Sequence, residues 1–272
     1  MKKGLKEKSS GRMDALKKGR HLAVYLMAGD GCLDTTERTV CALAREGVSV
    51  VELGLPFSDP LADGPVIQRA SERALKNGVN LRKILAAVRR IRKRSDVPMV
   101  VMTYYNIIYS YGVKEFIDDA AAAGIDGAII PDLPFDEEKV YYDYAAKKNF
   151  HTILLAAPSN TPARAAKIAE KSKGFVYYIL VKGVTGARVK SEADFGRLSA
   201  IKRQAKVPVF AGFGISTPRQ AGEVLKKADG IIIGSAFVKL FEKHQKNKKK
   251  IESAAVEFIR PFVRELRRSA GK

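Results

Sequence analysis

The sequence has 272 residues, 46% of them hydrophobic, and carries a formal net charge of +20. This length suits one or two domains, and the apolar content can build a large core. No apolar run approaches the roughly 18 residues of a membrane-spanning helix, and no apolar segment follows the basic N-terminus as in a signal peptide, so we expect a cytoplasmic protein that does not associate with membranes.

Along the chain, short apolar runs typical of strands alternate with longer segments of helical periodicity. Each run is continuously apolar, which is typical of parallel strands covered on both faces. The predicted strands are 21–29, 48–54, 98–105, 126–132, 151–157, 175–181, 208–214 and 229–235. The predicted helices are 33–46, 66–77, 81–95, 114–123, 135–148, 162–172, 192–205, 217–226, 236–244 and 249–268.

The repeated strand–helix pattern indicates a parallel α/β fold. Eight repeats favour a single-domain (β/α)8 barrel, or TIM barrel, with an extra N-terminal helix and helical insertions. The count alone does not exclude an open doubly wound sheet. No shift in composition marks a second domain, so we predict a flexible basic tail at residues 1–11 and one barrel domain at 12–272.

The positive charge raises the question of nucleic-acid binding. The charge gathers at residues 2–12, 82–94, 239–250 and 264–268. In the second of these segments the apolar residues recur at helical spacing, so the basic residues occupy the opposite, solvated face. No zinc-finger or RNA-recognition motif accompanies them, and Cys32 and Cys41 form neither a disulfide framework nor a zinc set. We therefore favour a basic enzyme surface without specific nucleic-acid binding.

Glu52 stands in the apolar run of the second predicted strand. Active sites of (β/α)8 barrels lie at the C-terminal ends of the strands, but a glutamate taken alone is better interpreted as structural. The next segment, 54–70, changes that interpretation, because three prolines stiffen it and it carries Asp59 and Asp63. Asp63 also fits a simple turn, since glycine and proline follow it.

Glycines follow the last two predicted strands. Gly212 and Gly214 end the seventh, while Gly234 and Ser235 end the eighth at a helix start. Barrels often bind phosphate in these two loops, because glycine lets the main chain approach an anion and the free N–H groups of a helix N-terminus face it. We therefore predict a phosphate site here, with the glycine-containing segment 182–188 as a lid or a further contact.

The three histidines are not at positions expected for the active site. His21 and His151 precede or begin strands and so fall at the opposite end of the barrel, and His244 lies in a lysine-rich helix. None is placed for acid–base work, and no cluster of metal ligands is visible. Acid–base chemistry on a phosphorylated substrate would then fall to carboxylates.

Several ordered motifs identify a family. FSDPLADGP at 57–65, behind ELG at 52–54, closely resembles the signature of tryptophan synthase alpha subunits. The resemblance covers residues 12–268 and continues through MTYYN (102–106), DGAIIPDLPFDE (126–137), AAPSNTP (156–162), GVTGAR (183–188), AGFGIST (211–217) and GSAFVK (234–239). The chain departs from the usual family pattern at 27–31, at 180–182 and at Ile107.

The resemblance implies a role for each matching position. Glu52 would be the catalytic acid–base, and Asp63 the second catalytic carboxylate, which binds the indole N–H. The positions implied to contact the rest of the substrate are Tyr25, Met102, Tyr104, Tyr177 and the lid residue Thr185. Those implied to bind its phosphate are Gly186, Gly214, Gly234 and Ser235. Those implied to meet a partner subunit are Pro56, Asp59, Pro60 and Asn106.

The resemblance also implies a reaction. It is the retro-aldol cleavage of indole-3-glycerol phosphate into indole and D-glyceraldehyde 3-phosphate, with no cofactor in this chain. Indole would pass to a PLP-dependent beta subunit, in an alpha2beta2 tetramer, which makes L-tryptophan from it and L-serine. Glu52 would start protonated in its apolar strand, and Asp63 would stay ionised. The alternatives are a stand-alone lyase, a non-catalytic regulatory partner of the beta subunit, and another barrel enzyme that acts on a sugar phosphate.

Overall fold

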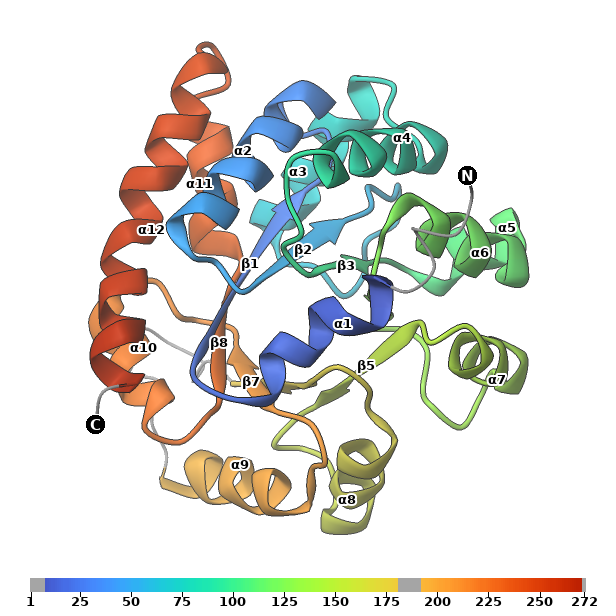
Figure 1. Ribbon diagram of the computed structural model, residues 1–272, viewed down its shortest axis with the longest axis vertical. Coiled ribbons are helices and arrows are strands. Elements are labelled where there is room, and N and C mark those ends of the chain that lie inside the picture. Colours follow the sequence, from blue (N-terminus) through green and yellow to red (C-terminus); the bar gives the residue numbers. More distant parts are fainter. Residues whose placement is uncertain (1–7, 181–191, 271–272) are drawn as a thin grey trace.

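Eight parallel strands close into a barrel, in which each strand pairs with the next and β8 pairs with β1 (Figure 1). The computed structural model describes residues 8–180 and 192–270. The closed order confirms the predicted (β/α)8 barrel and rules out an open sheet. The strands are β1 (His21–Met27), β2 (Val50–Gly54), β3 (Met99–Met102), β4 (Gly127–Ile129), β5 (His151–Ala156), β6 (Val176–Ile179), β7 (Val209–Gly212) and β8 (Gly230–Ile233).

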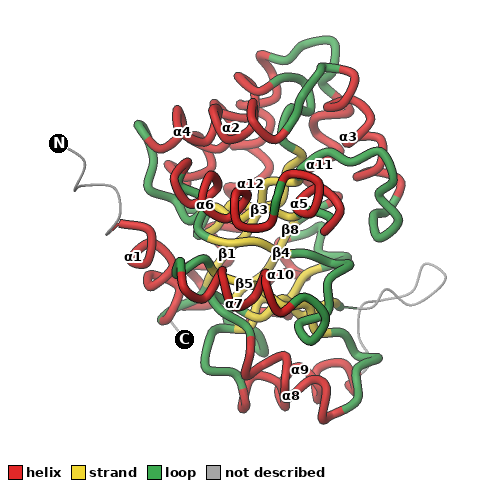
Figure 2. The backbone as a smooth tube through the Cα atoms, turned by 90° about the vertical axis from the view of Figure 1, so that its right-hand side faces the viewer, coloured by secondary structure: helices red, strands yellow, loops and turns green. Residues whose placement is uncertain are grey.

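Helices surround the strands, as Figures 1 and 2 show from two directions. Two lie before β1: α1 (Lys8–Asp14) and the 3-10 helix η1 (Ala15–Lys17). The others are α2 (Leu33–Glu46), α3 (Pro65–Lys76), α4 (Leu81–Arg92), α5 (Tyr105–Tyr111), α6 (Val113–Ala123), α7 (Lys139–Lys147), α8 (Pro162–Lys171), α9 (Glu192–Gln204), α10 (Pro218–Leu225), α11 (Ser235–Lys243) and α12 (Lys249–Ala270). Within the described ranges, none of these helices is both long and apolar enough to cross a membrane.

The segment after β3 differs from the sequence prediction. The strand predicted at 98–105 ends at Met102, and α5 begins at Tyr105. The Tyr105 N–H donates to the two carboxylate oxygens of Asp132 at 2.9 and 3.2 Å, so a carboxylate from the β4–α7 connection satisfies the start of α5. This partner lies 27 residues away in the sequence, so no local pattern could reveal it.

Both faces of the barrel wall are apolar. Side chains two residues apart on a strand share a face, so Leu22, Val24 and Leu26 of β1 pack outward against the helices. The interior is filled by Ala23, Val50, Val100, Ile129, Ile153, Phe175, Tyr177, Phe210 and Ile232. Burial on both sides explains why the predicted strands were continuous apolar runs.

The N-terminal segment covers the barrel at the end where the strands begin. Met13 and Leu16 join the interior cluster there. Most of the predicted tail, residues 1–11, lies outside the described residues, and α1 begins at Lys8. The domain boundary at residue 12 therefore stays a prediction.

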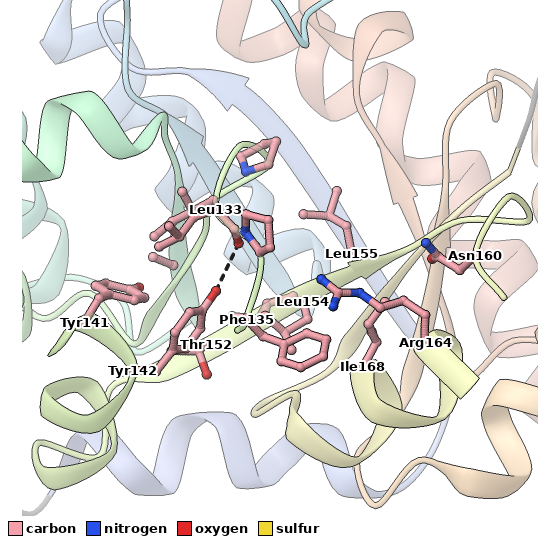
Figure 3. A pocket seen from close by; sticks show the side chains of 15 residues that line it. Leu133, Phe135, Tyr141, Tyr142, Thr152, Leu154, Leu155, Asn160, Arg164 and Ile168 are labelled. Carbon is pink, nitrogen blue, oxygen red and sulfur yellow. Dashed lines mark hydrogen bonds between the residues drawn. The ribbon is translucent and has the colours of Figure 1, made fainter. Parts of the chain in front are cut away.

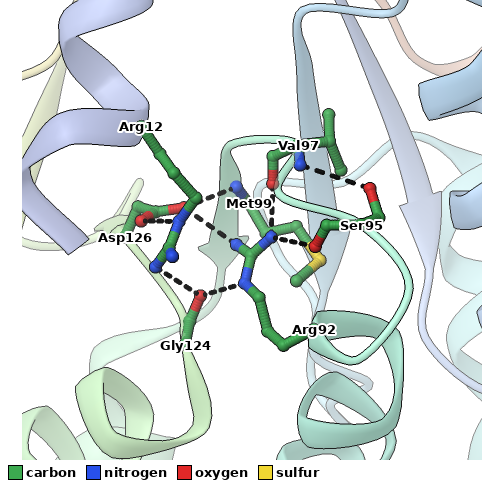
Figure 4. A network of polar contacts seen from close by, with 7 residues as sticks. All are labelled: Arg12, Arg92, Ser95, Val97, Met99, Gly124 and Asp126. Atoms are coloured by element: carbon green, nitrogen blue, oxygen red, sulfur yellow. Dashed lines mark hydrogen bonds and ion pairs between the residues drawn. The ribbon is translucent and has the colours of Figure 1, made fainter. Parts of the chain in front are cut away.

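A buried ion network joins this segment to the barrel (Figure 4). Arg12 Nε and Arg92 Nη2 lie 2.8 and 2.9 Å from the two oxygens of Asp126, whose side chain is completely buried. The Met99 N–H donates to the same carboxylate at 2.8 Å. Burial raises the pKa of Asp126, while Arg92 and the Met99 N–H oppose that rise. The network thus joins α1, α4 and the starts of β3 and β4.

We expect Arg92→Met to lower the free energy of unfolding by about 3 kcal/mol, because Asp126 would keep a buried charge with one guanidinium fewer. Arg89→Met, an exposed position on the same helix, is the matched control and should change it by less than about 0.5 kcal/mol. Urea denaturation followed by circular dichroism measures both. Equal losses in the two variants would contradict a stabilising network.

Candidate active site

The C-terminal ends of the strands meet at a cavity of about 700 Å³, a volume typical of small-molecule sites. The ends of β1, β3 and β6, the segment after β2 and the starts of α3 and α11 contribute to it. Its walls include Tyr25, Asp63, Met102, Tyr177, Phe213, Gly214, Gln220, Gly234, Ser235 and Lys239. Residues predicted to bind the substrate and residues predicted to bind phosphate therefore share one cavity.

Glu52 lies on β2, paired with Tyr25 of β1 on one side and Val100 of β3 on the other. Its side chain is completely buried, and neither carboxyl oxygen has a hydrogen-bond partner among the described residues. Burial raises the pKa of Glu52 to about 8, because the charged form loses its hydration. Glu52 is therefore mainly protonated at neutral pH, as expected from its apolar strand.

Two phenol rings stand beside Glu52. The pKa values of Tyr25 and Tyr177 are raised, first by burial and further by the charge of Glu52. Glycines make room for both rings: a β-carbon at Gly54 would lie 2.1 Å from Tyr25 Oη, and one at Gly212 would lie 2.7 Å from Tyr177 Oη. Because Gly54 and Gly212 lack side chains, the two phenol rings have room beside Glu52.

Asp63 faces the same cavity from the loop after β2. Burial raises the pKa of Asp63, whereas a hydrogen bond from the Tyr104 hydroxyl lowers it. The charges of both Asp63 and Glu52 act on the hydroxyl of Tyr25. The Tyr25 hydroxyl therefore interacts with both carboxyl groups, but of the two only Asp63, and not Glu52, is among the described residues that line the cavity.

Hydrogen bonds hold the loop that carries Asp63. The Asp63 N–H donates to the carbonyl of Pro60 at 3.0 Å, and Gln68 Nε2 donates to the carbonyl of Asp63 at 2.9 Å. The Ala62 N–H donates to Tyr104 Oη at 3.0 Å. Tyr104 thus contacts both the main chain of the loop and the Asp63 carboxyl. These contacts fix the position of that carboxyl.

Main-chain groups after β7 and β8 form another part of the cavity wall. Phe213 and Gly214, directly after β7, have φ values of 72° and 80°. For Phe213 this conformation is strained, and such strain is concentrated at functional sites. Gly234 leads into α11, whose first N–H groups lack partners within the helix, and a β-carbon added at Gly234 would meet no atom within 4 Å. Main-chain donors therefore border the open cavity there.

The remaining predicted site residues fall in three places. Thr185 and Gly186 lie outside the described residues. Asp59 and Asn106, predicted to meet a partner, are exposed, and Pro60 is partly exposed. Pro56, predicted with them, is buried in this chain.

Lys239 is a cavity residue that the sequence reasoning did not single out. It follows Ser235 by four positions on α11, and residues at this spacing share one face of a helix. That spacing is the signal that could have found it. Phe213 also lines the cavity, but its unusual backbone leaves no mark in the sequence.

His21 and His151 begin β1 and β5, so both lie at the end of the barrel opposite the cavity, as predicted. Burial lowers the pKa of each. Across the described residues, no three histidine, cysteine, aspartate or glutamate side chains are grouped so as to hold a metal ion.

A second cavity, of about 180 Å³, lies between β4, β5, α7 and α8 (Figure 3). Two of its polar side chains already have partners: Arg164 pairs with Asp136 and lies 4.2 Å from the centre of the Phe135 ring, and the Tyr142 hydroxyl donates to the carbonyl of Leu133 at 3.0 Å. The buried hydroxyl of Tyr141 has no partner among the described residues. None of the predicted site residues lines it. The larger cavity is therefore the candidate active site.

Comparisons with known proteins agree on one family. A family model described as tryptophan synthase alpha chain matches residues 13–267. The tryptophan synthase alpha chain of Geobacter sulfurreducens is 48% identical over 82% of this chain and 84% of its own length, and that of Petrotoga mobilis is 39% identical over 93% and 97%. Tryptophan synthase subunit alpha from Legionella pneumophila has a TM-score of 0.86 at 32% identity, covering 96% of this chain and 98% of its own.

Glu52→Gln should stabilise the fold by an amount that grows with pH. The folded-state pKa of about 8 lies above the ordinary 4.5, so between these values the folded chain keeps a proton that the unfolded chain loses. The free energy of unfolding of the wild type therefore falls as pH rises through this window. Relative to its value at low pH, the loss is about 1 kcal/mol at pH 5 and about 3 kcal/mol at pH 7, and the glutamine variant lacks this loss.

Urea denaturation at pH 5, 7 and 8 measures the difference between the variant and the wild type. Glu72→Gln, at an exposed glutamate of α3, is the control and should show no such growth. A Glu52→Gln difference that stays constant across this range would contradict a protonated Glu52.

Proposed function

This chain belongs to the tryptophan synthase alpha chain family, and we propose that Glu52 and Asp63 perform the family's reaction in it. Members of the family are lyases that cleave indole-3-glycerol phosphate. One observation carries the proposal: the buried Glu52 carboxyl, which has no partner among the described residues, and the Asp63 carboxyl both act on the hydroxyl of Tyr25, and Tyr25 and Asp63 line the same cavity as the start of α11.

Glu52 acts as acid and then as base. It donates its proton to C3 of the indole ring, which leaves the ring cationic and Glu52 ionised. The Glu52 carboxylate then removes the proton from the glycerol hydroxyl next to the scissile bond. The C–C bond breaks, its electron pair returns to the ring, and indole and glyceraldehyde 3-phosphate form while Glu52 regains its proton. A pKa of about 8 suits a group that must both give and take a proton near neutral pH.

Asp63 stabilises the charge that develops on the ring. Its carboxylate accepts a hydrogen bond from the indole N–H, which becomes more acidic as the ring gains positive charge. The Tyr104 hydroxyl favours the ionised form of Asp63, and the bonded loop holds it in position before the substrate arrives. Such preorganised charge is the usual source of a large rate effect.

The phosphate group binds where Gly214, Gly234 and Ser235 line the cavity. Gly186, which lies outside the described residues, is the fourth proposed phosphate contact. Binding energy from this unreactive part of the substrate holds its indole ring against Glu52 and Asp63. Tyr25, Met102 and Tyr177 supply the apolar surface for the ring. No step in this mechanism requires a cofactor in this chain.

A beta chain is the proposed partner. A solved relative from Pyrococcus furiosus is a tryptophan synthase complex. In this chain Leu61 and Tyr109 expose 93% and 70% of their surface, and they belong to the loop and to α5, the two elements that carry the predicted contacts Asp59, Pro60 and Asn106.

Exposed apolar side chains of this kind favour a docked chain over a stand-alone lyase. We propose an alpha2beta2 assembly in the cytoplasm, in which a PLP-containing beta chain converts the released indole into L-tryptophan. Pro56, which is buried, would shape the docking loop rather than contact the beta chain.

Glu52→Gln should reduce indole release from indole-3-glycerol phosphate at least about a hundredfold, and Asp63→Asn by a similar factor, because each removes a group that acts in the transition state. KM should change little in both. Asp59→Asn, at the exposed aspartate of the same loop, should leave the rate of the isolated chain unchanged.

Colorimetric indole determination measures all three rates. Near-normal turnover by Glu52→Gln would exclude it as the acid–base. A loss of binding alone in Asp63→Asn would mean that Asp63 only shapes the turn.

Tyr109→Ser should weaken association with the beta chain about tenfold or more, since a large exposed aromatic side chain would lose its contact. The cleavage rate of the isolated chain should not change. Leu75→Ser, at an exposed leucine near the C-terminal end of α3, is the control and should bind normally. Calorimetric titration with the beta chain measures the dissociation constants, and equal affinity of the two variants would place the docking surface elsewhere.

A further inference from the structure

The cavity wall also carries a cation, on α11. Lys239 lines the cavity together with Gly234, Ser235 and Ser216. Among the described residues that line this cavity, Lys239 is the one basic side chain and Asp63 the one acidic side chain. The cavity is therefore polarised, with its positive charge at the end where the main-chain donors lie.

Helix geometry directs Lys239 toward those donors. It lies one turn after Ser235, the first residue of α11. Long side chains on a helix lean toward its N-terminus, over the preceding turn. The ammonium group of Lys239 can therefore reach back to the space in front of the first N–H groups of α11, where an anion would sit.

An acidic group on the same helix as Lys239 is already paired with an arginine. Glu242 lies on the same helix, and its charge interacts with that of Lys239. Arg69 of α3 holds Glu242 through two hydrogen bonds of 2.7 and 3.1 Å. Within the described residues Lys239 takes part in no ion pair. Its charge thus remains available to a ligand in the cavity.

We propose that Lys239 binds the phosphate of the substrate directly and makes the site selective for a dianionic group. This inference rests on the proposed function, since that function places the phosphate at the same wall. The main-chain donors contribute only partial charges of about +0.5 at a helix N-terminus. Lys239 adds a full positive charge on a flexible side chain, and salt can screen its attraction to the phosphate.

The test compares Lys239→Gln with the wild type and with Lys243→Gln, a lysine one turn later on α11 that does not line the cavity. Calorimetry measures the dissociation constant of glycerol 3-phosphate at low and high salt, and indole release gives kcat and KM. We expect Lys239→Gln to raise both the dissociation constant and KM about tenfold, with kcat nearly unchanged and the salt dependence reduced. Lys239→Arg should restore most of the binding, and Lys243→Gln should resemble the wild type.

The outcomes separate this inference from the proposed function. If the wild type releases indole and Lys239→Gln binds glycerol 3-phosphate as tightly as Lys243→Gln, the role of Lys239 is wrong and the lyase assignment stands. A fall in kcat with unchanged KM would also overturn the inference. If the wild type releases no indole but its affinity for glycerol 3-phosphate depends on Lys239, the phosphate contact stands and the proposed reaction is wrong.

Discussion

Glu52 is buried inside an apolar barrel with no hydrogen-bond partner among the described residues, and this constraint governs the candidate site. An ionised carboxyl there is unfavourable, and burial raises the pKa of Glu52 to about 8. The phenols of Tyr25 and Tyr177 lie beside it, and larger residues in place of Gly54 and Gly212 would displace those rings. The raised pKa of Glu52 thus follows from its burial in the barrel.

The two ends of the barrel differ: one holds a stabilising ion network, and the other holds the candidate active site. At the end where the strands begin, Asp126 is buried with two arginines and a main-chain donor, which compensate its negative charge. Toward the other end, Glu52 has no hydrogen-bond partner among the described residues. The buried Glu52 carboxyl lowers the free energy of unfolding, and favourable interactions elsewhere in the fold must offset that loss. This separation agrees with the general placement of active sites in (β/α)8 barrels.

Much of this arrangement could be predicted from the sequence, because the decisive signals were local. Continuous apolar runs located all eight strands, and the position of Glu52 at the end of one indicated a buried carboxyl. What could not be predicted depends on distant contacts. α5 starts where a residue 27 positions away satisfies its first N–H, Gly54 matters because of a ring on another strand, and Lys239 becomes a site residue only when α11 is placed beside the cavity.

The ion pair between Arg12 and Asp126 spans 114 residues, which sets an order of events during biosynthesis. When the ribosome has made α1, its partner carboxylate does not yet exist, and nearly half of the chain must emerge before the pair can form. Until then Met13 and Leu16 have no barrel interior to enter. The N-terminal helix is thus made first but can complete this contact only after the residue that precedes β4 has emerged.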